Sequence, residues 1–249
     1  MVSTSYALAI TPADITTDTI SESRTFKFQE AGNTFYLRHD LNLEWPKAIN
    51  GFNDIAGLQG AIITSVFNNS YPNLQDAIKS LDKFEKTDAM LVDSIPSTVE
   101  KKCTAEEIGT VKFKSCNKEI MCYEIIAYSQ NAGAAGVTFN SFLNYDMATG
   151  KTFIYKNTFI PGARKGIISS LQKALMEKEG YKTLAALEEA GYDFSMIENP
   201  ENFYFDNDNI YFVFHPYEIT AETEDSVTIA VPKANLMQLL SPEAKAAIK

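Results

Sequence analysis

The residue types that could carry nucleophilic or acid–base catalysis are present, but they lack the partners that catalysis needs. The two histidines, His39 and His215, lie outside the H-E-x-x-H pattern of zinc peptidases. The S-x-x-K pattern occurs three times, beginning at Ser80, Ser115 and Ser170, without the accompanying motifs of serine–lysine enzymes. Neither the G-x-S-x-G elbow nor the P-loop pattern occurs. The sequence therefore predicts no catalytic residue.

The cysteines and one Asx-rich run come nearest to a metal site. Cys103, Cys116 and Cys122 show neither C-x-x-C spacing nor histidine partners at ligand spacing, so they form either one disulfide with a leftover thiol or three thiols. The run Asp206–Asn209 lacks the glycine and the distal glutamate of a calcium loop. Asx side chains that stabilise a tight turn explain this run more simply. We expect no metal and no cofactor.

Charge and hydropathy exclude two classes of partner. The 249-residue chain has 32 acidic and 22 basic residues and a formal net charge of −10, whereas nucleic acids and anionic membranes require a basic face. No run of about 18 apolar residues occurs, so we expect no membrane-spanning segment in this chain. An acidic patch of Glu218, Glu222, Glu224 and Asp225 is either a solvated loop or a surface for a basic partner.

The elements that would position these residues alternate between strands and amphipathic helices. Period-two alternation predicts a hairpin of strands over 25–29 and 33–40, and Pro46 is expected to break the chain after it. Apolar residues at helical spacing predict helices over 54–67 and 74–85. Further strands are predicted over 111–115, 121–128, 137–145 and 152–155.

The C-terminal part is arranged around Asn209–Pro232, which reads as two strands with an acidic connection. Ile210, Phe212 and Phe214 alternate with Tyr211, Val213 and His215, and Val227–Val231 repeats the pattern. Helices are predicted over 161–178 and 183–190 before the hairpin, which is entered through Phe203–Phe205. Two short helices are predicted after it, over 233–240 and 242–248.

Several segments in this order resemble a known family. They are Asn144–Lys151 with its D-x-x-T-G-K pattern, Asn157–Phe159, Asn202–Phe205, Ile210–Ile219 with its F-x-P-Y-E-I pattern, and Val227–Pro232. Together they resemble the RsiV-like extracytoplasmic domain of a lysozyme-sensing anti-sigma factor, of a cell-wall deacetylase and of exported lipoproteins of Bacteroides-type bacteria. Trp45–Gly51 and the helix after it resemble the usual N-terminal companion of that domain.

The resemblance implies an α+β fold, with twisted antiparallel sheets and helices packed mainly on one face. Residues 1–22 are rich in Thr, Ser and Asp and are expected to form a flexible lead-in, part of which could add as an edge strand. The resemblance divides the remainder into a companion region over 23–155 and an RsiV-like region over 156–249, which would be closely packed halves or one globule. It also implies a periplasmic or cell-surface protein, lipid-anchored in its precursor, and catalysis that belongs to a separate module.

Two departures from the family pattern locate the expected specificity. Ala132–Gly136 keeps the small residues of a family segment but lacks its histidine, and Ala221–Asp225 replaces an aromatic residue and a glycine. We therefore expect partner contacts at Tyr217, Glu222, Glu224 and Asp225. The hypothesis is a non-enzymatic binding or sensor domain for a basic lysozyme-like protein or a cell-wall glycan. The alternatives are a cell-wall hydrolase with paired carboxylates and a structural subunit.

Overall fold

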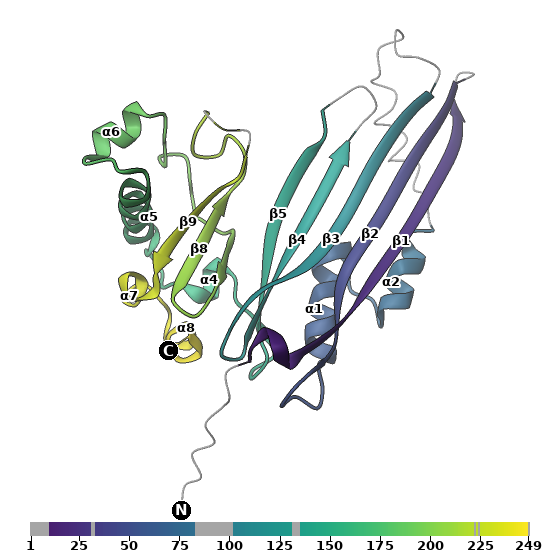
Figure 1. Cartoon of the computed structure of the whole chain (residues 1–249), viewed down its shortest axis with the longest axis horizontal. Helices are drawn as coiled ribbons and strands as arrows, with labels where there is room; N and C mark the ends of the chain where they lie inside the picture. The colour runs from purple at the N-terminus through teal and green to yellow at the C-terminus, as the bar shows by residue number, and fades with distance from the viewer. Residues whose placement is uncertain are drawn as a thin grey trace, which may run out of the picture. The chain divides into compact units, whose positions relative to one another are not determined.

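The computed structural model describes residues 10–30, 33–82, 102–130, 135–221, 223 and 225–248. The chain divides into two compact units (Figure 1). Unit 1 comprises Met1–Asp14, Lys114–Tyr123 and Ser141–Lys249, and unit 2 comprises Ile15–Phe113 and Glu124–Asn140. A six-stranded sheet has the order β1-β2-β3-β4-β5-β6, and a three-stranded sheet has the order β7-β8-β9. The predicted α+β class is confirmed.

The first hairpin, in unit 2, is much longer than the sequence pattern predicts. β1 (Ile15–Glu30) pairs antiparallel with β2 (Asn33–Ile49) along its whole length. The expected break at Pro46 is wrong, because β2 continues through it. A register shift between Thr16 and Thr17, opposite Pro46, accommodates the proline, which has no amide hydrogen for the ladder. Residues 15–22, expected in the lead-in, thus belong to an edge strand, the alternative left open above.

The expectation of a purely antiparallel sheet is wrong at one pair. β2 and β3 (Lys102–Asn117) run parallel, with Thr34 opposite Lys102 and Leu43 opposite Val111. Parallel neighbours need a long crossover, which usually contains a helix. The chain between the two strands supplies it with α1 (Ala56–Phe67) and α2 (Leu74–Ser80). The sheet is therefore mixed.

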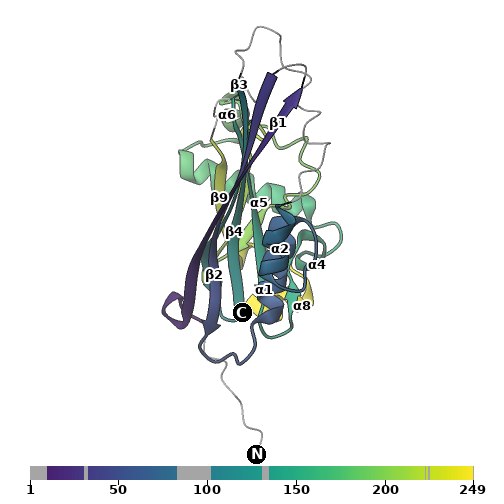
Figure 2. The ribbon, with the colours of Figure 1, turned by 90° about the vertical axis from the view of Figure 1, so that its right-hand side faces the viewer.

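Helices α1 and α2 lie on one face of the unit 2 strands (Figures 1 and 2). α1 buries Leu58, Ile62 and Ile63, close to the stripe that its sequence predicts. α2 begins after Asn73, whose side chain accepts a hydrogen bond from the Asp76 amide at 2.9 Å. α2 ends at Ser80, and the predicted continuation toward residue 85 passes outside the described residues after Asp82.

The three-stranded sheet of unit 1 confirms the predicted hairpin. β8 (Asn209–Phe214) lies between β7 (Phe203–Phe205) and β9 (Val227–Pro232), with both pairs antiparallel. The helices of this unit include α5 (Arg164–Glu179) and α6 (Leu184–Glu189), both predicted, and α4 (Tyr155–Thr158), which was not. The chain ends in α7 (Lys233–Leu236) and α8 (Pro242–Ile248).

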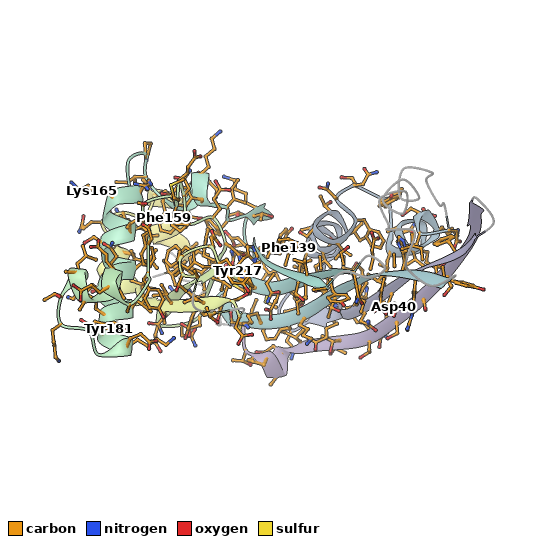
Figure 3. All side chains as sticks on the ribbon, turned by 90° about the horizontal axis from the view of Figure 1, so that it is seen from above. Asp40, Phe139, Phe159, Lys165, Tyr181 and Tyr217 are labelled. Carbon is orange, nitrogen blue, oxygen red and sulfur yellow. The ribbon has the colours of Figure 1, made fainter. Side chains whose placement is uncertain are left out.

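Aromatic rings fill the core of unit 1. Phe159 lies within this core (Figure 3), with its ring 5.5 Å from that of Phe203 and 6.1 Å from that of Phe212. Phe205 and Phe214 are buried with them. Leu171 and Leu175 of α5 belong to the same cluster. These side chains explain why alternating aromatic positions in the sequence form this sheet.

Side chains of β3, β4 (Ile120–Gln130) and β5 (Val137–Asp146) form hydrogen bonds with the free edge of β7. The short strand β6 (Lys151–Thr152) follows β5 in the chain. The Asn144 amide donates to the Phe203 carbonyl at 2.8 Å, and the Ser115 hydroxyl donates to that of Phe205. The Cys122 thiol lies 3.4 Å from the same Phe205 oxygen. An edge whose carbonyls are satisfied in this way cannot easily pair with another strand.

Replacing Asn144 by alanine should destabilise unit 1. Asn144 is 1% exposed, and its loss leaves the Phe203 carbonyl without its donor in a buried place. We expect the free energy of unfolding to fall by about 1–3 kcal/mol. Urea unfolding of the variant and of the exposed-site control Asn235→Ala measures the difference. A loss for Asn144→Ala no larger than that of the control would contradict this role.

Candidate functional site

Tyr217 combines two unusual features for a surface residue of unit 1, a positive φ angle and an exposed aromatic side chain. It lies in the turn after β8, where the His215 amide donates to Glu218 Oε2 at 2.7 Å and the Glu218 amide donates to the His215 carbonyl at 3.1 Å. Its φ angle is +64°, which a bulky L-residue rarely adopts, and its side chain is 60% exposed. Residues held in such a conformation are concentrated at functional sites.

A second loop lies beside this turn. Tyr192 forms a β-bridge with Thr220, and the Asp193 amide donates to the Ile219 carbonyl at 2.7 Å. Phe194 packs edge-on against Phe214, with the ring centroids 5.7 Å apart. We call the two segments 188–198 and 215–225 the loop end. They lie at one end of the three-stranded sheet, whereas α7 and α8 lie toward the other (Figure 1).

The loop end belongs to a part of the chain whose charged residues are all acidic. Between Lys182 and Lys233 there are eleven acidic residues and neither a lysine nor an arginine. The remaining sequence has 22 basic and 21 acidic residues, so the net charge arises in this span. The exposed acidic residues of the loop end that the structure describes are Glu188, Glu189, Asp193, Glu198, Glu218 and Asp225. The loop end therefore creates a negative potential.

Hydrogen bonds fix the shape of the second loop. The Asp193 carboxylate accepts from the Ser195 amide at 2.7 Å and from its hydroxyl at 3.1 Å, and these bonds lower the pKa of Asp193. From α5, the Arg164 guanidinium donates to the Ile197 carbonyl at 2.7 Å. A hollow of about 220 Å³ lies here, lined by residues that include Arg164, Tyr192 and Asp193. Because its pKa is lowered, Asp193 keeps its negative charge at neutral and mildly acidic pH.

The structure places two of the four expected partner residues. Tyr217 and Asp225 are both exposed and belong to the loop end, and the Asp225 amide donates to the Thr223 hydroxyl at 3.0 Å. Glu222 and Glu224 lie outside the described residues. The sequence analysis did not include the 190–197 loop in the site. The absence of lysine and arginine from Thr183 to Pro232 could have indicated it.

The D-x-x-T-G-K segment forms a turn with its own hydrogen bonds. The Asp146 carboxylate accepts from the Ala148 amide at 2.9 Å and from the Thr149 hydroxyl at 2.7 Å. Lys151 Nζ lies 3.4 Å from Glu243 Oε1 of α8. Asp146 is buried, so its two oxygens serve the turn. This motif thus has a structural explanation.

The imidazoles and thiols have local partners as well. His39 Nε2 lies 3.4 Å from Glu107 Oε2 in unit 2, and within the described residues no group of three His, Cys, Asp or Glu side chains could hold a metal ion. Cys116 and Cys122 are free thiols. Burial raises the pKa of both and brings that of Cys122 to about 12, so they stay protonated at neutral pH. The Cys103 side chain lies outside the described residues.

The run Asp206–Asn209 forms the Asx-stabilised turn that its sequence predicts. The Asp206 carboxylate accepts from the amides of Asp208 and Asn209, at 2.8 and 2.7 Å, and from the Tyr211 hydroxyl at 2.7 Å. Partial burial alone would raise the pKa of Asp206, but these hydrogen bonds and Lys233 lower it overall. Below the ordinary pKa of 3.8, the unfolded chain therefore takes up this proton before the folded chain does.

Replacing Asp206 by asparagine should remove a pH-dependent part of the stability. At pH 7 we expect the variant to lose roughly 0.5–1 kcal/mol, because the group is partly exposed and solvent screens it. The difference from wild type should shrink as the pH falls below 3.8, where the wild-type advantage is lost. Urea unfolding at pH 7 and pH 3 measures it, with Asp208→Asn as the neighbouring control. A difference that does not change with pH would contradict this account.

One family model matches part of this chain. Residues 156–234 match the DUF3298 family model, described as a protein of unknown function. This region contains both segments of the loop end and the whole three-stranded sheet. No curated protein matches the sequence.

Two crystal structures of DUF3298 family members share the fold. One, from Bacteroides fragilis, is 21% identical with a TM-score of 0.72, and the match covers 94% of this chain and 97% of that one. The other, from Pseudomonas aeruginosa, is 12% identical with a TM-score of 0.59, over 92% and 96% of the two chains. At these identities the likeness concerns the fold. Within the described residues, no helix has the length and apolar character needed to cross a membrane.

Proposed function

We propose that this chain is a non-enzymatic extracytoplasmic binding domain whose loop end captures a basic protein, such as a lysozyme-like protein. One observation carries the proposal: an exposed tyrosine in a left-handed conformation lies on the loop end, whose two segments contain acidic residues but no lysine or arginine. Tyrosine is enriched where interfaces concentrate their binding energy. Complementary charge around such an anchor accelerates association and selects the partner.

The backbone geometry of the turn supports Tyr217 as an anchor residue. A turn that only reversed the chain would be satisfied by glycine or asparagine at a positive φ angle. Tyrosine at this place stores strain of about 1–3 kcal/mol, which the surrounding hydrogen bonds must offset. A tyrosine side chain has only two χ torsions, so little conformational entropy is lost when a partner binds it.

The resemblance to RsiV-like domains supports the remainder of the proposal. From this resemblance we infer a periplasmic or cell-surface location, a lipid anchor in the precursor and a role as part of a bacterial envelope protein. Asp146 and Glu243, the two acids beside the D-x-x-T-G-K turn, do not favour the hydrolase alternative, since Asp146 serves its own turn and Glu243 pairs with Lys151. A glycosidase would instead need two carboxylates free to face a substrate.

Calorimetry with a cationic lysozyme tests the proposal. We expect one-to-one binding with a dissociation constant on the order of 1–10 µM at 50 mM salt, weakened roughly tenfold at 300 mM salt. An acidic protein of similar size and soluble cell-wall glycan fragments serve as comparisons. Equal binding of the acidic protein, binding of the glycan alone, or no heat with lysozyme at 100 µM protein would each overturn the proposed partner.

A further inference from the structure

A pocket of about 470 Å³ lies in unit 1, among the β3–β4 turn, the turn after β5 and helix α8. These elements lie away from the loop end, toward the other end of the three-stranded sheet (Figure 1). A pocket of this size is within the range of small-molecule sites in proteins. Charged side chains of Lys118, Glu119, Lys151 and Glu243 line it together with small and apolar residues.

Backbone hydrogen bonds hold the three walls in place. The Met147 amide donates to the Glu119 carbonyl at 2.9 Å and joins the two turns. The Gly150 amide donates to the Asp146 carbonyl at 2.8 Å within the second turn. Ser241, just before α8, donates through its amide to the Thr158 carbonyl at 2.8 Å. The pocket is therefore preformed, so a ligand need not order its walls.

Part of the pocket wall is formed by apolar side chains. Ala148, Ala246 and Ala247 present methyl groups, and Phe153, which is 5% exposed, also lines the pocket. No lining residue offers an exposed aromatic face on which a sugar ring could stack. The walls thus suit an aliphatic or aromatic body better than a glycan.

The rim carries two neighbouring pairs of opposite charge. Lys118 and Glu119 are adjacent in the β3–β4 turn, and the Lys118 backbone has a φ angle of +53°. Lys151 and Glu243 lie 3.4 Å apart at 61% and 64% exposure, so solvent screens their attraction. A ligand with a single charge would meet one matched and one repelling group at each pair. A zwitterion matches both signs.

We propose that this pocket binds a short apolar peptide with free termini. Its side chains would fill the space beside Ala148, Ala246 and Ala247. Its carboxylate would pair with Lys118 or Lys151, and its ammonium group with Glu119 or Glu243. This site is independent of the proposed partner of the loop end.

Titration with the dipeptide Leu-Phe tests the proposal on the wild-type chain. The probe is compared with its N-acetylated, C-amidated form and with decanoate, which carries only a negative charge. We expect a dissociation constant on the order of 100 µM for the zwitterion and at least tenfold weaker binding of both comparison ligands. Equal binding of the capped peptide, or no binding of the zwitterion at 5 mM, would overturn the proposal.

Alanine methyl groups report the location of binding without any substitution. In a sample labelled at alanine methyls, we expect Leu-Phe to shift the NMR signals of Ala148, Ala246 and Ala247 and to leave that of Ala185 in α6 unchanged. The variant Ala148→Trp should fill the pocket and abolish binding, whereas the equally exposed control Ala185→Trp should keep it. Shifts confined to other alanines would place the ligand elsewhere and contradict the assignment.

Discussion

Replacing Tyr217 by glycine is expected to weaken binding of a basic partner by about 10–100-fold while leaving the fold as stable as before or more stable. The loss follows from the removal of an exposed aromatic anchor, since such residues contribute about 2 kcal/mol or more in protein interfaces. The stability follows from the φ angle of +64°, which glycine adopts without strain. Calorimetry and urea unfolding on the same preparation measure the two quantities.

The opposite signs of these effects separate a binding role from a structural one. Lys118→Gly is a matched control, because Lys118 is also exposed at a positive φ angle, in another turn of unit 1. We expect this control to match the stability change and to leave partner binding within twofold of wild type. If Tyr217→Gly bound as well as wild type, Tyr217 would not be the anchor. A loss of stability above 1 kcal/mol would assign it a structural role instead.

Replacing Phe212 by alanine is expected to cause the largest loss of stability in unit 1. Phe212 is fully buried on the central strand β8, with its ring 6.1 Å from Phe159 and 6.0 Å from Phe203. Truncating a buried phenylalanine typically removes 3–5 kcal/mol, through lost apolar burial and the cavity left behind. That is a large fraction of the free energy of unfolding of most domains, which is about 5–15 kcal/mol.

Thr228→Ala on the neighbouring strand is the control for Phe212→Ala. Thr228 is exposed and lies opposite Val213 in the β8–β9 ladder, so its loss should change the free energy of unfolding by less than about 0.5 kcal/mol. Urea unfolding followed by circular dichroism measures both variants. A loss below 1 kcal/mol for Phe212→Ala would show that the aromatic cluster does not hold this unit together.

Local patterns predicted the elements that have a regular hydrophobic period. The alternation of Ile210, Phe212 and Phe214 predicted β8, and the Ile167, Leu171 and Leu175 stripe predicted α5. Each of these side chains is buried on the face that its period indicates. Where the hydrophobic period matches the buried face of an element, the sequence alone predicts that element.

Non-local pairing limited the rest of the fold prediction. The parallel pairing of β2 with β3 joins segments about 68 residues apart, such as Thr34 and Lys102, and no local pattern encodes it. The bulge at Thr16 and Thr17 lets β2 continue through Pro46, and it becomes visible only when both strands are paired. α4 has only four residues and depends on Asn157, whose side chain accepts from the Ile154 amide at 2.8 Å. The domain division at residue 155 stays a prediction.

The candidate site shows the same limit. Asp225 was predicted from a departure within one motif, and Tyr217 belongs to the adjoining F-x-P-Y-E-I pattern that matches the family. The loop over 190–197 joins them through the bond from the Asp193 amide to Ile219 and is shaped by the contact of Arg164 with Ile197. These contacts link residues that are 26 and 33 positions apart. The concentration of charge, in contrast, was readable from the sequence alone.

A pair of charge-reversed variants distinguishes the charge of the loop end from the net charge of the whole chain. Glu189, Glu198 and Asp225 are changed to lysine in one variant, and Asp18, Glu177 and Glu179 in the other. All six side chains are exposed or near the surface, and both variants change the net charge by the same amount. The measurement is the dissociation constant for a cationic lysozyme at 50 mM salt.

We predict that the loop-end variant binds the lysozyme at least tenfold more weakly than wild type, while the control variant stays within about threefold. That result would place recognition at the loop end. Equal weakening of both variants would mean that the net charge of the chain, and not this surface, attracts the partner, and it would contradict the account.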